Sequence, residues 1–306
     1  MKRSLVAMAA LTLFACSHGA PPAETKAPTA AAVDATDVFR FHVGSLEAIA
    51  LKDGDIHIPN DGKTVGVGQG KEAVGALLSS AGVSAETIDF SIQPLAVRDG
   101  ARILLFDTGA GDASFAKAGR LTASLRAASI EPSAVTDVFL SHGHPDHIGG
   151  FVTPEGTSAF PKARIHVSAP EWEAMRADPK HASLVKMIGP QVDAFAPNAT
   201  ILPSVTAVAV RGHTPGHSAY RISSGSEHLL YVGDSVHHSV VSVQKPDWTI
   251  AFDLGGDAPT AQASRRALLE QASTENLRIY AGHFPFPGIG HVRKQGDGFV
   301  WVPEAK

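Results

Sequence analysis

Short apolar runs alternate along the chain with amphipathic stretches and with turns rich in glycine and proline. Alternation of apolar and polar positions predicts strands, and the turn signal Arg98-Asp99-Gly100 predicts a hairpin. Strands are expected at residues 38–51 (a pair), 88–97, 101–106, 136–140, 163–168, 205–210, 218–223, 228–232 and 277–281. Apolar positions at helical spacing predict helices at residues 71–80, 121–128, 170–177 and 259–272, the last with Arg265 and Arg266 on its polar face. Hairpins followed by helices are typical of an α/β fold.

Composition indicates one large domain preceded by a linker. Apolar residues make up 44% of the chain, enough for a sizeable core, and no shift in composition divides residues 37–306. Residues 16–36 are rich in alanine, proline and threonine, which predicts a flexible tether. The formal net charge is −4, and no basic patch interleaved with aromatic residues is visible. We therefore expect no nucleic-acid partner.

The first residues predict export. Met1-Lys2-Arg3 is basic, an apolar run follows, and Leu13-Phe14-Ala15-Cys16 resembles a lipobox. The apolar run is too short to span a bilayer, and the single cysteine of the chain excludes an internal disulfide. We expect residues 1–15 to be a lipoprotein signal peptide and the protein to lie in the periplasm or on the outer membrane, held only by lipid on Cys16. A plain secretory signal with an incidental cysteine is the alternative.

The stretch Ser-His-Gly-His-Pro-Asp-His that begins at Ser141 is a dense group of potential metal ligands. It follows a predicted buried strand, and α/β folds place their sites at the carboxyl ends of strands. Imidazole and carboxylate groups bind zinc and similar divalent ions. His142 and His144 can share one ion, whereas Asp146 and His147, adjacent at the start of a short helix, point elsewhere. The stretch therefore predicts two metal ions.

Four ligands cannot complete two metal sites, so further ligands are expected downstream. His217, Asp234 and His283 each lie near an apolar, strand-like run and beside or close to a glycine, which lets backbone segments approach closely. His213 lies four positions before His217 in the same Gly-His-Thr-Pro-Gly-His stretch and is the competing candidate.

The order His-x-His-x-Asp-His, a single His, a Gly-Asp and a late Gly-His resembles the metallo-β-lactamase superfamily from about residue 89 to residue 283. The resemblance implies an αββα four-layer sandwich, two mixed sheets with helices outside. As interpreted here, it assigns His142, His144 and His217 to one ion and Asp146, His147 and His283 to the other, with Asp234 bridging both. It also implies that Asp107, in an Asp-Thr-Gly motif, supports the site without binding metal.

This ligand set implies hydrolysis. A hydroxide that bridges two ions is available near neutral pH because the cations lower the pKa of bound water. Asp234 would hold the pair of ions, and Asp146 is the candidate proton carrier. Zinc is the expected metal, although the same ligands accept manganese, iron or cobalt.

Further stretches resemble the methyl parathion hydrolases and the related exported quorum-quenching lactonases, among them Phe115-x-x-x-Gly119-Arg120-Leu121 and Pro170-Glu171-Trp172. This resemblance implies a small-molecule substrate with an apolar portion. Candidates for the pocket wall are Phe115, Trp172, Phe195 and Phe284, for which ordinary core packing is the alternative. His237 stands where acyl-homoserine lactonases of the superfamily carry a tyrosine that contacts the lactone carbonyl. It is expected to replace that tyrosine or to support the ligands.

The leading hypothesis is a dinuclear metal-dependent hydrolase that opens lactones such as N-acyl homoserine lactones. The first alternative is an organophosphate triester hydrolase of the methyl parathion type. The second is a β-lactamase, which the bridging carboxylate of Asp234 disfavours. A non-catalytic lipoprotein that binds metal or a partner is the alternative from a different class, and the sequence leaves a homodimer open.

Overall fold

The computed structural model describes residues 37–304 of the 306-residue chain. The signal peptide, the lipid on Cys16 and the tether lie outside the described residues and stay predictions. Between residues 37 and 304, no helix has both the length and the apolar character needed to cross a membrane.

The first of two seven-stranded sheets combines antiparallel and parallel strands. Its strands in spatial order are β1 (Val38–Val43), β2 (Leu46–Leu51), β6 (Leu95–Asp99), β7 (Arg102–Phe106), β8 (Asp137–Phe139), β9 (Arg164–Ser168) and β10 (Val192–Phe195). Pairs from β1 to β7 are antiparallel, and pairs from β7 to β10 are parallel. Parallel neighbours need crossover connections, which here contain the helices α2 (Leu121–Ala127), α3 (Pro145–Ile148), α4 (Ala169–Ala177) and α5 (Ala182–Ile188).

The second sheet is mostly antiparallel. Its strands in spatial order are β11 (Thr200–Leu202), β12 (Val205–Ala209), β13 (Ser218–Ser224), β14 (Glu227–Tyr231), β16 (Arg278–Tyr280), β17 (Ile289–Gln295) and β18 (Gly298–Pro303). Only β14 and β16 pair in parallel, and α7 (Ala258–Thr274) lies in the crossover between them.

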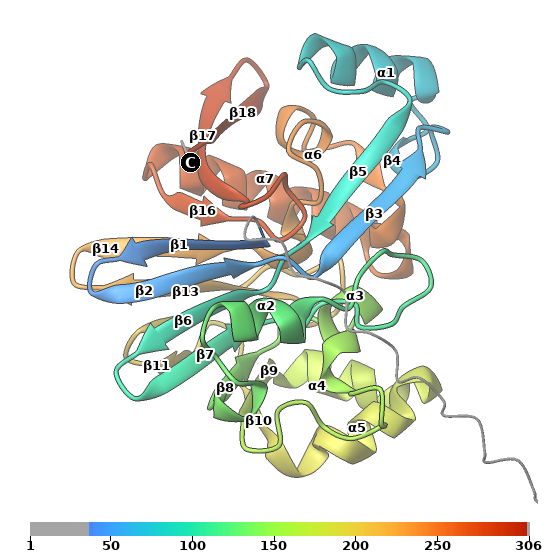
Figure 1. Cartoon of the computed structure of the whole chain (residues 1–306). Helices are drawn as coiled ribbons and strands as arrows, with labels where there is room; N and C mark the ends of the chain where they lie inside the picture. The colour runs from blue at the N-terminus through green and yellow to red at the C-terminus, as the bar shows by residue number, and fades with distance from the viewer. Residues whose placement is uncertain (1–36, 305–306) are drawn as a thin grey trace, which may run out of the picture. The chain divides into compact units, whose positions relative to one another are not determined.

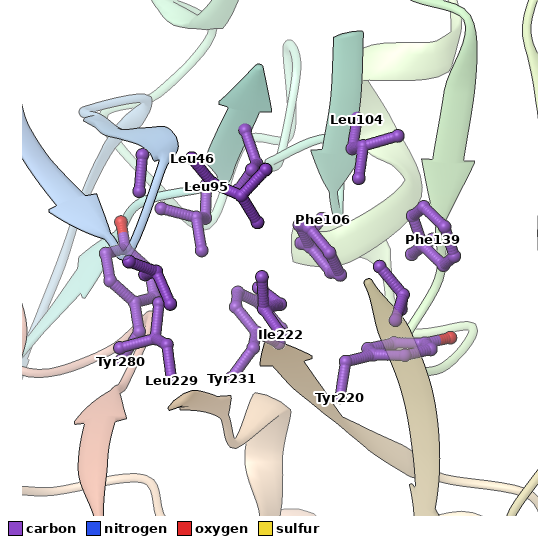
Figure 2. Packing of buried hydrophobic residues seen from close by; sticks show 14 of the residues in the cluster. Leu46, Leu95, Leu104, Phe106, Phe139, Tyr220, Ile222, Leu229, Tyr231 and Tyr280 are labelled. Carbon is purple, nitrogen blue, oxygen red and sulfur yellow. The ribbon is translucent and has the colours of Figure 1, made fainter. Parts of the chain in front are cut away.

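The two sheets face each other across an apolar core, which Figure 2 shows from close by. Phe106 of β7 stacks on Phe139 of β8 at a centroid distance of 4.9 Å, and Tyr220 of β13 meets both rings edge-on at 5.5 Å. The outer face of the first sheet is covered by α2, α4 and α5, and that of the second by α7 (Figure 1). The predicted αββα sandwich is confirmed.

An arm of residues 54–92 extends beyond the two sheets (Figure 1). It contains β3 (Gly54–Pro59), β4 (Val65–Val67), α1 (Lys71–Ser80) and β5 (Thr87–Ile92), with β3 and β5 paired antiparallel. Its apolar residues form a separate core with α6 (Val241–Gln244) and β15 (Thr249–Ile250), which pairs with β4. The arm thereby contacts the chain segment that follows Asp234.

A buried carboxylate lies at the start of β8. Asp137 accepts hydrogen bonds from Arg102 Nη1 at 2.9 Å and from Thr136 Oγ1 at 2.7 Å, and its Oδ1 lies 3.0 Å from His166 Nε2. Burial alone would raise the pKa of Asp137, but the hydrogen bonds from His166, Thr136 and Arg102 outweigh it and lower the pKa to about 2. The ionised carboxylate therefore joins three strands of the first sheet.

Most predicted elements are confirmed, and the helix at 71–80 has the same bounds in the structure. The strand predicted at residues 88–97 is wrong as one element, because β5 ends at Ile92 and β6 begins at Leu95 in a different sheet. Gln93 and Pro94 separate them, and proline cannot donate a ladder hydrogen bond.

Candidate metal centre

The candidate ligands lie where strands of both sheets end. The supporting residue Asp107 follows β7, and the histidines of the Ser141 stretch follow β8 and run into α3. His213 lies between β12 and β13, while Asp234 follows β14 and His283 follows β16. The sandwich thus brings residues far apart in the sequence to one edge of both sheets.

The first group of donor atoms is His142 Nε2, His144 Nδ1, His213 Nε2 and Asp234 Oδ2. His213 Nε2 lies 3.1 Å from His142 Nε2 and 2.9 Å from His144 Nδ1. Asp234 Oδ2 lies 3.4 Å from His213 Nε2 and 3.8 Å from His142 Nε2.

The second group is Asp146 Oδ2, His147 Nε2, His283 Nε2 and the other oxygen of Asp234, Oδ1. Asp234 Oδ1 lies 3.0 Å from both imidazole nitrogens, and Asp146 Oδ2 lies 3.6 Å from His147 Nε2 and 3.4 Å from His283 Nε2. The two oxygens of Asp234 therefore face one group each.

These separations fit metal coordination. Atoms bound to one zinc ion at 2.0–2.1 Å in tetrahedral geometry lie about 3.3 Å apart. Asp234 Oδ1 is buried and accepts no hydrogen bond from the part of the chain that the structure describes, which is costly for a carboxylate without a cation. The donor atoms of both groups are nitrogen and carboxylate oxygen, the set that suits a divalent ion of the zinc type.

Three candidate ligand histidines have a hydrogen-bond partner on the ring nitrogen that faces away from the clusters. Hydrogen bonds join His147 Nδ1 to Asp107 Oδ2 at 2.7 Å, His213 Nδ1 to Asp253 Oδ1 at 2.9 Å and His283 Nδ1 to Ser91 O at 2.7 Å. Such partners fix the tautomer and leave the other nitrogen free to bind a metal.

Asp107 supports the site as predicted. Besides His147, its carboxylate accepts hydrogen bonds from Ser141 N at 2.8 Å, Ser141 Oγ at 2.6 Å and Tyr231 Oη at 2.7 Å. Its backbone is left-handed, with φ 57°, a conformation that aspartate tolerates better than most residues. The strained backbone at the end of β7 thus carries a carboxylate whose two oxygens both form hydrogen bonds.

Burial and charge divide the histidines into two classes. Burial lowers the pKa of His142 well below its ordinary value and that of His213 to about 3, so both are neutral at pH 7. Burial also lowers the pKa of His147, but the carboxylates of Asp234, Asp146 and Asp107 outweigh it and raise the pKa well above its ordinary value. The electrostatic potential is therefore more negative at the second group than at the first.

The prediction that His217 binds the first ion is wrong, and His213 takes its place in the cluster. His217 Nδ1 donates to Val210 O at 3.1 Å, and its Nε2 accepts a hydrogen bond from Asp234 N at 2.9 Å. With both nitrogens engaged, His217 has no lone pair to offer. It is a buried residue that holds the backbone of Asp234, and Gly233 is required beside it because a Cβ there would lie 2.7 Å from His217 Nε2.

Two of the predicted pocket residues are core residues instead. Phe195 belongs to the core between the sheets, and Phe284 is 1% exposed and packs edge-on against Trp301 under α7. Trp172 packs against the core between the first sheet and its helices. Phe115 is 50% exposed in the loop before α2, and its role stays a prediction.

An aromatic group that the sequence pattern did not predict lies beside the second cluster. Phe90 of the arm lies 6.1 Å from the His283 ring and 6.0 Å from Phe252, which in turn lies 5.7 Å from His237. Phe252 belongs to the 3-10 helix η7 (Ala251–Gly255) and is 41% exposed. The stretch Phe-Asp-Leu-Gly-Gly that begins at Phe252 places an aromatic residue beside a carboxylate and a turn, which is only a weak sequence signal for a functional site.

Glu171 was also missed as a supporting residue. Its buried carboxylate accepts hydrogen bonds from Gly143 N at 2.8 Å, Thr214 Oγ1 at 2.6 Å and Gly216 N at 3.0 Å. It thus connects the loop of His142 and His144 with the loop of His213.

His237 lies beside Asp234, and Asp146 is a member of the second donor group. His237 is 1% exposed, and neither ring nitrogen has a hydrogen-bond partner within residues 37–304. Its Nε2 lies 3.4 Å from Asp234 Oδ2. The Asp146 side chain is 16% exposed, compared with 5% for the side chains of His147, His283 and Asp234.

Known structures with the same architecture include a lactonase. AidC, a dizinc quorum-quenching lactonase solved with its product N-hexanoyl-L-homoserine, is 31% identical, with a TM-score of 0.83 over 88% of this chain and 98% of that one. A hydrolase of the β-lactamase superfamily, AbOPH, is 24% identical, with a TM-score of 0.78 over 90% of this chain and 99% of that one, and this likeness concerns the fold.

Among curated proteins, a probable metallo-hydrolase of Mycobacterium tuberculosis is 28% identical over 125 residues, 35% of this chain. The match spans only 38% of that relative's length. The family model of the metallo-beta-lactamase superfamily matches residues 90–283, more than half of the chain and every residue of both donor groups. The chain therefore belongs to the metallo-beta-lactamase superfamily, among its metal-dependent hydrolases.

Proposed function

We propose that the protein is a dinuclear metal-dependent hydrolase that opens lactones, N-acyl homoserine lactones included. The observation that carries this proposal is the placement of Asp234, whose Oδ2 faces one donor group and whose Oδ1 faces the other. Similarity to a dizinc quorum-quenching lactonase supports the lactone as the substrate class.

When bound, two ions of the zinc type supply a water molecule of lowered pKa and polarise the substrate carbonyl. The residues that would hold the first ion are His142, His144, His213 and Asp234, and those for the second are Asp146, His147, His283 and Asp234. Five of these residues are buried, which keeps bulk water from their donor atoms and strengthens the charge interactions among them: His142, His147, His213, Asp234 and His283.

Asp146 is the candidate for proton transfer to the leaving group. Opening a lactone releases an alkoxide, which must gain a proton. The Asp146 carboxylate belongs to the second group and is its most exposed member, so it can exchange a proton with solvent and with the leaving oxygen.

His237 is the candidate for binding the lactone carbonyl. Its imidazole is buried beside Asp234 and has no hydrogen-bond partner in the described part of the chain. A buried polar group without a partner is costly unless a ligand satisfies it. An N–H of His237 directed at the carbonyl oxygen would supply that partner and stabilise the charge that develops there.

Substrate turnover and metal content, measured on one sample of the purified chain, test the proposal. N-hexanoyl homoserine lactone, methyl parathion and a cephalosporin serve as substrates in parallel assays. We expect two ions per chain and the highest kcat/KM for the lactone, and Asp234→Ala should lose the second ion and most turnover. Asp193→Ala, whose carboxylate is 51% exposed on β10, is the matched control. Two bound ions without lactone opening would refute the substrate class, and fewer ions would refute the dinuclear site.

A further inference from the structure

Two neighbouring arginines of α7 have opposite environments, although the sequence pattern placed both on the polar face of that helix. Arg266 forms a surface ion pair with Asp247. Arg265 is 0% exposed. A buried guanidinium costs several kcal/mol unless its N–H groups and its charge are satisfied, so its partners indicate why it is there.

Arg265 binds the two segments that carry the metal-centre residues. Its Nε donates to Ser235 O at 2.9 Å, directly after Asp234 in the chain. Its Nη2 donates to Asp253 Oδ2 at 2.5 Å, and the other oxygen of Asp253 lies 2.9 Å from His213 Nδ1. An unbroken chain of charge-assisted hydrogen bonds therefore leads from α7 to a candidate ligand.

The backbone of the His213 loop is docked on the same end of α7. Gly212 lies so close that a Cβ there would be 2.1 Å from Ala261 N. Asp257 N, just before the helix, donates to Gly212 O at 2.7 Å. The helix thus holds the backbone of His213 through Gly212 and its side chain through Arg265 and Asp253.

We propose that Arg265 is a positioning residue for the first metal ion. By fixing Asp253, it holds His213 Nδ1 as the donor and directs Nε2 toward His142 and His144. Of the two donor groups that share Asp234, only the first contains His213, so loss of the Arg265–Asp253 link acts mainly on the first ion. This inference rests on the proposed dinuclear centre. Partners of this kind change metal affinity by about 10–100-fold.

Competition between the full chain and a chromophoric chelator for Zn²⁺ tests the proposal without an activity measurement. Arg265→Met should weaken the first ion by about 10–100-fold and change the second by less than about threefold. Arg266→Met is the matched control and should bind both ions as the wild type does. His213→Ala and His283→Ala identify which ion is lost, because each removes a donor from one group only.

Asp253→Asn examines the same link from the other side and preserves the side-chain volume, so it replaces Arg265→Met if that variant does not fold. Circular dichroism of the metal-free proteins establishes folding. Wild-type affinity for the first ion in a folded Arg265→Met or Asp253→Asn protein would overturn the proposal, and so would an equal loss of both ions. A wild-type chain that binds fewer than two ions would instead refute the proposed function.

Discussion

Exchange of His213 and of His217 for glutamine distinguishes a ligand from a residue that supports one. His213→Gln removes an imidazole nitrogen from the first donor group, so we expect loss of one Zn²⁺ per chain. His217→Gln should retain both ions, because the glutamine carbonyl can still accept the Asp234 N–H. Its cost should appear in stability instead.

The magnitude follows from the hydrogen bonds of His217. The residue is 0% exposed, donates to Val210 O and accepts from Asp234 N. Each buried polar group left without a partner costs about 1–3 kcal/mol. His217→Ala therefore loses about 2–6 kcal/mol before any cavity is counted, and His217→Gln about half of that. At about 2–4 °C per kcal/mol for a domain of this size, His217→Gln should lower Tm by roughly 2–12 °C.

Metal content by mass spectrometry and Tm by calorimetry on the metal-free proteins measure the two effects separately. Metal removal is needed because bound ions stabilise the folded state by mass action. Two ions in His213→Gln together with one ion in His217→Gln would refute the reasoning. So would a His217→Gln protein with unchanged Tm.

Three further predictions concern stability and specificity. The pKa of Asp137 is about 2 in the folded state and 3.8 in the unfolded state. Its ionised form therefore contributes about 2 kcal/mol to the free energy of unfolding above pH 4, and this contribution is lost as the pH falls from about 4 to about 2. Asp137→Asn should therefore lower the free energy of unfolding in urea by about 2 kcal/mol at pH 7 and by less at pH 3, and an equal loss at both would contradict this. Phe252→Ala should lower kcat/KM for a decanoyl homoserine lactone by about 10-fold and for a butanoyl one by less than about threefold, because each buried methylene of the acyl chain contributes about 0.8 kcal/mol. The control is Val83→Ala, since Val83 is 43% exposed and follows α1, away from the donor groups. Equal losses for both lactones would contradict a role of Phe252 in recognition of the acyl chain. Chelation should lower Tm by several degrees, because the donor groups lose the cation that stabilises the folded state, and added Zn²⁺ should restore Tm. An unchanged Tm would argue against a bound metal.

Most strands of the α/β fold were predictable because they are short apolar runs separated by clear turns. The αββα arrangement of the sheets followed from the family resemblance. Elements at the edges were not predictable. Strands β17 and β18 alternate weakly, and β17 carries Arg293 and Lys294 near its end. Helices α5 and α6 are too short for a helical period to show. The arm was missed as a unit because its core forms with residues about 150 positions downstream, which no local pattern reports.

Most of the metal centre was predictable because the ligands of one loop lie within a few positions of each other and each downstream ligand follows a strand. The residues that the arm and η7 place beside the centre could not be predicted from the sequence. Phe90 and Phe252 approach the site only because the arm packs against the segment after Asp234. Phe195 and Phe284 have the composition of pocket residues, and only tertiary packing places them in cores.

The choice between His213 and His217 shows where local information ends. Both follow an apolar strand, both stand beside a glycine and both become fully buried, so spacing and burial do not separate them. What separates them is the partner of the second ring nitrogen. His217 meets two backbone groups and is satisfied, whereas His213 meets the Asp253 carboxylate, which leaves Nε2 free beside two other imidazoles. Because Asp253 lies 40 positions downstream and is itself held by Arg265, the identity of the ligand depends on α7 as much as on the motif that contains it.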